Sequence, residues 1–252
     1  MLIKDHTERK IQHEKNREAI LNFLLAHRYS NLKNIAYDLG HKSTATASRI
    51  LRKMCYEGLV RREEIKDSFT RVVLFGITQK GIDQTGNFID DFQTFQKSKV
   101  SLRTLEHTLT NQRIISKYSK FDSVMKDIRV VNTEFGNLKK YEDIVKFKHR
   151  PDGLLLGKVI TDSGRVDDHL SALVIETELS LKSQKRYRQI WREYVYLLKK
   201  GRVYAFLYIM KDEAALKRIE TLFKKEKFDL PIKDRKELEE IERRFCFTTL
   251  TP

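Results

Sequence analysis

The chain has few residues that crosslink or punctuate a polypeptide. Its 252 residues include only two cysteines, three prolines and ten glycines. Cys55 and Cys246 lie far apart and show no metal-binding spacing, so we expect neither a disulfide framework nor a zinc site, and we expect a reducing, intracellular environment. The low content of proline and glycine excludes a fibrous or low-complexity protein.

Long apolar runs are also lacking. One of the longest, YAFLYIM at 204–210, is far shorter than the about 20 residues that cross a bilayer. The charged residues 1–20 contain no apolar core of an export signal. We therefore expect no membrane insertion and a cytoplasmic location. The hydrophobic content of 40% is nevertheless enough for a packed core.

Positive charge is what the chain has in excess. Fifty Lys and Arg residues against 35 Asp and Glu residues give a net charge of +15 and a pI near 9.7. The excess is 16 − 10 = +6 over residues 1–86 and 34 − 25 = +9 over residues 87–252, so it is no mere basic tail. Such a balance favours a polyanionic partner, either nucleic acid or an acidic membrane surface.

The first third of the sequence has the pattern of three helices. Apolar residues recur near helical spacing in HTERKIQHEKNREAILNFLLAHR at 6–28. We expect Ser30 to cap a short second helix that Gly40 ends, and HKS to turn into a third helix, TATASRILRKMCYEG, that Gly58 ends. Two short helices joined by a tight turn predict a helix-turn-helix.

Two strand-like runs follow these helices. LVRREEIK at 59–66 and RVVLFGI at 71–77 flank the polar turn DSFT, and TQKG then starts a short Thr-capped helix. This order resembles winged helix-turn-helix domains over roughly residues 7–86. We predict a DNA-binding domain at 1–86 and a connector, or partly ordered segment, at 87–100.

In winged helix domains the second helix of the motif enters the major groove. The resemblance implies DNA contacts from its basic and hydroxyl side chains and from basic residues in or near the wing. These residues are Lys42, Ser43, Thr44, Thr46, Ser48, Arg49, Arg52, Lys53, Arg61, Arg62 and Arg71. The other interpretation is that they are ordinary solvated charges and that the domain serves packing or dimerisation.

Residues 101–252 have the pattern of a mixed α/β (α+β) domain. A helix at 101–118 precedes three strands, IRVVNTEF, HRPDGLLLGKV and SALVIETEL. A helix at about 181–199, the strand RVYAFLYIM and the helix DEAALKRIETLFKK then follow. This order predicts a compact mixed sheet with helices.

Acidic residues end one of these apolar strands. Glu176 and Glu178 share a strand face, about 6–7 Å apart, where two buried carboxylates require a cation. Either a basic side chain or a divalent metal, Mg²⁺ or Mn²⁺, can supply it. Asp152 on the neighbouring strand would complete an oxygen-rich pocket. We expect the bases that begin the next helix, Lys182, Lys185 and Arg186, to balance transition-state charge, or simply to pair with the glutamates.

The motif PDG, the acid 24 positions later and the basic helix after it resemble the PD-(D/E)XK phosphodiesterase superfamily, whose core is restriction-endonuclease-like. That superfamily usually has lysine two residues after the strand acid, whereas this chain has Glu178. The lysine role would therefore move to Lys182 or Lys185.

A narrower resemblance covers nearly the whole chain. LEHTLTNQRI, RPDGLL and IETELSLKSQKRYRQIWREY are similar to the replication-relaxation group, in particular to MOBC-class plasmid relaxases. Such enzymes join a winged helix to a nuclease-like domain and nick one strand at a plasmid transfer origin. The resemblance implies a divalent cation, a supercoiled or locally melted duplex as substrate, and accessory mobilisation and coupling proteins as partners.

The same resemblance implies roles for individual residues. Asp152, Glu176 and Glu178 would bind the metal, and Lys182 would act electrostatically. Arg186 and Tyr187 would lie near the scissile phosphate. His107 would add a ligand or a phosphate contact, although a histidine at such a position is more often structural. Tyr187 also lies at helical spacing with three further apolar residues, which favours a packing stripe over a covalent nucleophile. These residues are Trp191, Tyr194 and Leu198.

Three functions remain open from the sequence. The first is a metal-dependent enzyme that nicks DNA. The second is a non-catalytic regulator of plasmid replication or transcription, which the displaced lysine favours. The third is a restriction-type enzyme that breaks both strands, although nothing in the sequence requires two-fold symmetry. The sequence leaves the oligomeric state open.

Overall fold

The computed structural model describes residues 5–66, 71–86, 92–120, 125–132, 145–160 and 163–250. The chain divides into two compact units, Met1–Arg113 and Ile114–Pro252. Each unit has its own hydrophobic core, and each is described by itself below.

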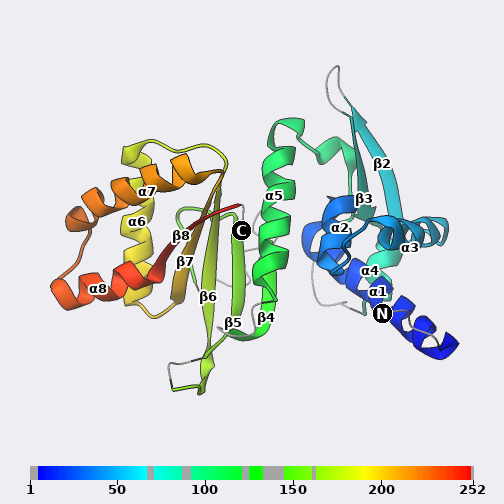
Figure 1. Cartoon of the computed structure of the whole chain (residues 1–252), viewed down its shortest axis with the longest axis horizontal. Helices are drawn as coiled ribbons and strands as arrows, with labels where there is room; N and C mark the ends of the chain where they lie inside the picture. Colours follow the sequence, from blue (N-terminus) through cyan, green and yellow to red (C-terminus); the bar gives the residue numbers. More distant parts are fainter. Residues whose placement is uncertain are drawn as a thin grey trace. The chain divides into compact units, whose positions relative to one another are not determined.

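The first unit is a winged helix. Its three-stranded antiparallel sheet has the order β1-β3-β2, and the β2–β3 hairpin forms the wing (Figure 1). The elements are α1 (His6–His27), β1 (Tyr29–Asn31), α2 (Leu32–Asp38), α3 (Ala45–Tyr56), β2 (Val60–Lys66), β3 (Arg71–Ile77), α4 (Gln79–Gln84), a 3-10 helix (Lys97–Lys99) and the first part of α5 (Leu102–Tyr118). The expected turn DSFT lies outside the described residues.

Side-chain caps set several helix starts in this unit. The Asp5 carboxylate accepts from the Thr7 N–H at the start of α1, and Thr78 caps α4 as the sequence predicts. The prediction for α2 is wrong, because its N-cap is Asn31, whose side chain accepts from the Asn34 N–H at 2.8 Å. Ser30 belongs instead to β1, a strand that sequence patterning misses.

The winged-helix core lies between the helices and the sheet. Ile20 and Leu24 of α1, Leu51 and Met54 of α3, and Leu74 of β3 are all at most 1% exposed. Burying side chains of this size contributes about 1.5–3 kcal/mol each, which makes this cluster the main stabilising element of the unit.

Part of the expected connector packs on the wing sheet. Phe95 is buried, and its N–H donates to the Ile77 carbonyl at 2.9 Å. A Cβ atom at Gly76 would come within 2.2 Å of the Phe95 side chain, so only glycine allows the ring to lie there. Residues 87–91 of the connector are outside the described part of the chain.

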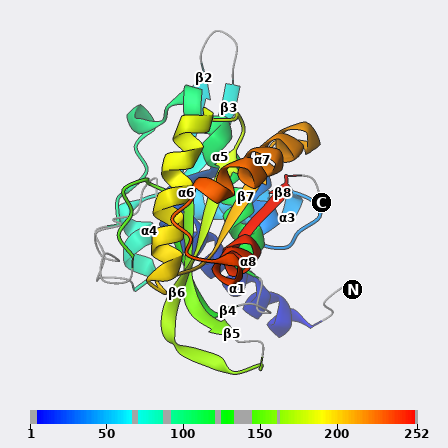
Figure 2. The same ribbon diagram turned by 90° about the vertical axis from the view of Figure 1, so that its left-hand side faces the viewer.

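The second unit is built on a five-stranded mixed sheet of order β4-β5-β6-β7-β8 (Figure 2). The β4–β5 and β5–β6 pairs are antiparallel, whereas β6–β7 and β7–β8 are parallel. The elements are the end of α5, β4 (Met125–Asn132), β5 (Gly153–Ile160), β6 (Val166–Glu178), α6 (Gln184–Lys199), β7 (Val203–Met210), α7 (Glu213–Glu226), a 3-10 helix (Lys227–Asp229), α8 (Arg235–Arg244) and β8 (Phe245–Thr249).

Helices cover both faces of this sheet. Helices α6, α7 and α8 lie on one face, where Trp191, Tyr194 and Phe206 are completely buried (Figures 1 and 2). The end of α5 packs on the other face through Ile114 and Ile115. The α/β fold class that the sequence predicts is therefore confirmed.

The C-terminal helix and strand are absent from the sequence-based prediction. Helix α8 buries only Ile241, and most of its other residues are charged. Strand β8 has five residues and completes the parallel half of the sheet. In the part of the chain that the structure describes, no helix is both long enough and apolar enough to cross a bilayer.

Candidate functional site: a recognition helix and a buried carboxylate cluster

Helix α3 has one buried face and one basic face. Ala47, Ile50, Leu51 and Met54 point into the core. The opposite face exposes three bases that the sequence predicts as DNA contacts, which are Arg49, Arg52 and Lys53.

The hydroxyl residues around α3 are less available. Thr44, Thr46 and Ser48 are half-buried, while Lys42 and Ser43 are exposed in the turn before the helix. The Ser43 hydroxyl accepts from the Ala45 N–H at 3.4 Å and so helps to start the helix. Because exposed bases outnumber exposed hydroxyls, contacts to phosphates are better supported here than contacts to base edges.

The wing bases are exposed but partly paired. Arg71 makes an ion pair with Glu64 at 2.9 Å, and Arg61 lies 3.9 Å from Glu63. Arg62 is exposed on β2. Among the described residues Arg49 and Arg52 have no ion pair, so α3 offers DNA more uncompensated charge than the wing does.

Sequence reasoning misses one residue of this surface. Tyr56 is 95% exposed in the last turn of α3 and lies seven positions after Arg49, on the same helix face. The helical spacing of Arg49, Arg52, Lys53 and Tyr56 was a signal that could have identified it.

In the second unit the three predicted acids meet where β5 begins and β6 ends. The antiparallel register pairs Gly153 with Ile175, which places Asp152 beside Glu176. The Asp152 carboxylate accepts from the Thr177 N–H at 2.8 Å, and this bond holds it against β6. Glu176 and Glu178 are almost completely buried, with side chains 2% exposed.

Lys182 is the cation nearest to these carboxylates. Its Nζ donates a short hydrogen bond to Glu178 and lies 3.9 Å from Glu176. Burial raises the pKa of Glu178, and the Glu176 and Asp152 charges raise it further, while Lys182 opposes the shift. Lys182 therefore stabilises a carboxylate in surroundings that disfavour its charge.

Two residues that sequence reasoning misses bind Glu176. The Tyr194 hydroxyl donates a short hydrogen bond to Glu176 Oε1, and His149 Nε2 lies 3.1 Å from the same oxygen. Arg186 Nη2 donates to His149 Nδ1 at 3.1 Å. Because arginine has no acceptor, His149 must carry its proton on Nε2 and donate it to Glu176. The position of His149, three residues before Asp152, was the available sequence signal.

The other predicted catalytic residues lie in different surroundings. Lys182 precedes α6, which begins only at Gln184, and Lys185 is exposed in the first turn of that helix. Tyr187 is buried, its ring stacks on Trp191, and its hydroxyl accepts from the Lys182 N–H at 3.2 Å. Burial and the Glu178 charge raise its pKa, which disfavours the phenolate that a nucleophile would need.

His107 belongs to the first unit, where it is half-buried on α5. The carboxylate cluster belongs to the second unit, and the role of His107 stays a prediction.

The donor atoms of the cluster suit a divalent cation in kind. Carboxylate oxygens are the ligands that Mg²⁺ and Mn²⁺ prefer. Within the described ranges, however, no three His, Cys, Asp or Glu side chains are arranged so that they could hold a metal ion directly. In this structure Lys182 pairs with Glu178 and lies 3.9 Å from Glu176, so it offsets part of the charge of the glutamates.

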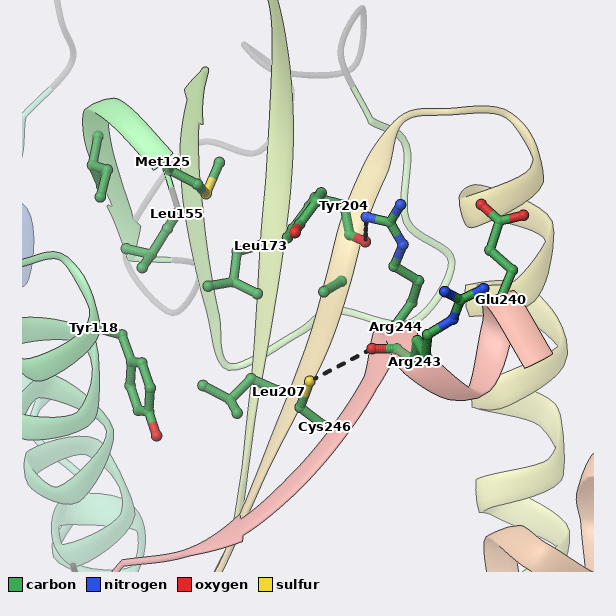
Figure 3. Close-up of a pocket in the computed structure, with 12 residues that line it drawn as sticks. Tyr118, Met125, Leu155, Leu173, Tyr204, Leu207, Glu240, Arg243, Arg244 and Cys246 are labelled. Carbon is green, nitrogen blue, oxygen red and sulfur yellow. Dashed lines mark hydrogen bonds between the residues drawn. The ribbon is translucent and has the colours of Figure 1, made fainter. Parts of the chain in front are cut away.

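A hollow of about 660 Å³ lies on the sheet face opposite α6 (Figure 3). Leu155, Leu173 and Leu207 form its apolar wall, and Arg243 and Arg244 lie at its rim. None of the predicted site residues lines it. It is therefore a separate feature from the carboxylate cluster.

No protein-family model matches the chain, and no curated protein matches it significantly. Among solved structures, a mutant of MepR from a multidrug-resistant clinical isolate of S. aureus is similar to it, at 21% sequence identity and a TM-score of 0.27. The match covers 47% of this chain and 99% of that one. Since such a TM-score does not define a common overall fold, the winged helix is assigned from its own elements.

Proposed function

We propose that this protein binds duplex DNA through its winged helix, with α3 in the major groove. The observation that carries this proposal is the basic face of α3, where Arg49, Arg52 and Lys53 are exposed opposite a buried apolar face. Bases on such a face neutralise phosphates and release counterions. The wing supplies further contacts from Arg61, Arg62 and Arg71.

For the second unit we propose metal-dependent nicking of one DNA strand, as in MOBC-class relaxases acting at a plasmid transfer origin. The order α5-β4-β5-β6-α6-β7, with three antiparallel strands followed by a parallel one, supports this proposal. It is the element order expected of the PD-(D/E)XK core. The acids also lie at the strand ends where that core has its site.

Each residue of the cluster has a proposed role. Asp152, Glu176 and Glu178 are not arranged to hold an ion directly in this structure, so they would have to shift to bind Mg²⁺ or Mn²⁺. A bound ion would polarise a phosphoryl oxygen. Lys182 and Arg186 would balance the charge that develops on the phosphate. Lys185, exposed on the same helix turn, is placed to contact a neighbouring phosphate. Tyr187 serves packing.

The experiment is a nicking assay on supercoiled plasmid that carries its own transfer origin, with and without Mg²⁺. Nicking by the wild type should convert the supercoiled DNA to open circles. Asp152→Asn should abolish it, because the amide keeps the hydrogen bond from Thr177 but removes a charged oxygen. Asp168→Asn, an exposed position on β6, is the matched control and should nick normally.

Equal nicking by Asp152→Asn and by the control would refute the proposed site. Linear DNA in place of open circles would instead favour a restriction-type enzyme that breaks both strands.

A second candidate function is a non-catalytic DNA-binding regulator. Two observations favour it: Lys182 already offsets part of the charge of the glutamates, and Glu176 already accepts from His149 and Tyr194. A regulator would bind its operator equally well with and without divalent cations. It would also leave supercoiled plasmid intact, even when accessory proteins are present.

A further inference from the structure

A basic groove of about 560 Å³ lies in the second unit between residues 145–149 and α6. Its lining includes four basic side chains, one amide and one exposed aromatic ring. These are Lys146, Lys148, Arg186, Gln189, Arg192 and Tyr196, here called the basic groove.

One wall of the groove is the segment 145–149, whose residues alternate between more buried and exposed positions. Val145 is buried in the core, and Phe147 packs edge-on against Tyr194. Lys146 and Lys148 alternate with them and are exposed. Both lysines line the groove.

The other wall is the exposed face of α6. Arg186, Gln189, Arg192 and Tyr196 are exposed there, and Tyr196 remains 57% exposed despite its large ring. Arg192 also reaches the Asp229 carbonyl, at 3.4 Å. From Arg186 to Tyr196 the helix rises about 15 Å, at about 1.5 Å per residue, which is the length of about four stacked nucleotides.

Among the described residues that line the groove, Glu193 is the one acid, and it is already engaged. The Glu193 carboxylate accepts from the backbone N–H groups of Lys148 and His149, the latter at 2.9 Å. These hydrogen bonds join α6 to residues 148 and 149 and hold the opposite wall of the groove in place. The described lining residues thus carry four basic side chains against one carboxylate.

The groove borders the carboxylate cluster at His149. The imidazole lines the groove, while its two nitrogens bond Arg186 and Glu176, each at 3.1 Å. A DNA strand with one phosphate next to the cluster can therefore place its neighbouring phosphates along the basic groove.

We infer that the basic groove binds a single strand of DNA next to the phosphate that is cleaved, with a base stacked on Tyr196. This inference rests on the proposed nicking function and adds where the strand lies. An exposed aromatic ring beside bases is the usual platform for unpaired nucleotides. A paired duplex would have no free base face to offer to Tyr196.

The charge of the groove is tested by the salt dependence of binding to a labelled single-stranded oligonucleotide, measured by fluorescence anisotropy in a chelator. The full chain with Lys148→Gln and Arg192→Gln should lose two phosphate contacts. The slope of log Kd against log salt should then fall by about 1.4, at about 0.7 per phosphate. The matched control is Lys217→Gln with Arg218→Gln, which removes the same charges from exposed positions on α7 and should keep the slope.

The stacking contact is tested separately. Tyr196→Ala should weaken single-strand binding by about 5- to 150-fold without changing the salt slope, because stacking contributes about 1–3 kcal/mol per base and involves no counterion release. Tyr196→Phe keeps the ring and should bind like the wild type. All these side chains are exposed, and the fluorescence of buried Trp191 checks that each variant is folded.

Each outcome decides one claim. An unchanged slope and affinity in the groove variants would overturn the inference, even if the protein nicks plasmid. A slope that falls for duplex but not for single strands would overturn the single-strand assignment. If the groove variants reduce the salt slope but the wild type does not nick plasmid, the groove binds single-stranded DNA and the nicking proposal is wrong.

Discussion

Replacing Lys182 by methionine tests whether the second unit keeps its glutamates as buried ions. Methionine preserves most of the stem but removes the ammonium group, which donates to Glu178 and lies 3.9 Å from Glu176. Removing one partner of a buried ion pair lowers the free energy of unfolding by about 3–5 kcal/mol. Because the Lys182 side chain is 29% exposed, water compensates part of the loss and we expect about 3 kcal/mol.

The stability that Lys182→Met loses should increase with pH. The folded pKa of Glu178 already lies above its ordinary value of 4.5, and removal of Lys182 raises it further. A carboxyl whose pKa is higher in the folded than in the unfolded protein does not destabilise the fold at a pH below the unfolded pKa. It destabilises the fold increasingly as the pH rises through the folded pKa. The deficit of Lys182→Met should therefore be large at neutral pH, shrink as the pH falls toward about 4.5, and vanish below it.

Trp191 makes the assay specific to this unit. It is the one tryptophan of the chain, and it is completely buried in the second unit's core. Thermal unfolding followed by its fluorescence should show a Tm lower by about 10 °C at neutral pH, at about 3 °C per kcal/mol for a unit of this size. Lys185→Met, three residues later and exposed, is the matched control and should leave Tm unchanged.

Divalent cations extend the same measurement. If the carboxylates bind Mn²⁺, the ion should restore the stability of Lys182→Met more than it stabilises the wild type, because it replaces the missing positive charge. A neutral-pH Tm of Lys182→Met equal to that of the control would refute the reasoning, since the glutamates would then not depend on Lys182.

Three further predictions concern both units. Arg49→Ala with Arg52→Ala should weaken duplex binding and reduce the salt slope by about 1.8, at about 0.9 per phosphate, in an anisotropy titration; an unchanged slope would place the DNA elsewhere. Burial lowers the pKa of His27 to about 3 from 6.5, so the first unit should lose stability as the pH falls below 6.5, by about 2 kcal/mol at pH 5, and His27→Leu should remove this loss in denaturant titrations. Arg188 lowers the pKa of Glu226 to about 2, so this pair stabilises the fold above about pH 4.5 and fails as the pH falls toward 2; Glu226→Gln should flatten that part of the stability curve.

Elements with strong local signals could be predicted from the sequence. Helix α3 has an apolar stripe and ends at Gly58, and β6 has the apolar run before its acids. Helix α8 is mostly charged and buries one residue, Ile241, so it lacks the wide apolar stripe on which the sequence analysis relied. The start of α2 was ambiguous because Ser30 and Asn31 are both good caps, and only the β1–β3 pairing decides between them.

The carboxylate cluster could be predicted only as far as local strand spacing determines it. Spacing along β6 places Glu176 and Glu178 on one face, and the antiparallel register with β5 then adds Asp152. The contribution of His149 depends on how residues 145–149 pack on α6, which involves Glu193 from a distant part of the sequence. Long-range packing of this kind leaves no local pattern.

Helix α5 has a consequence for how the protein unfolds. The division between the units falls inside it, after Arg113. Gln112 binds Ser30 and the Tyr29 carbonyl in one core, while Ile115, less than one helical turn later, is buried in the other. Because helical hydrogen bonds form cooperatively over several turns, melting α5 withdraws buried side chains from both cores at once. Side chains of this one helix are therefore part of both cores.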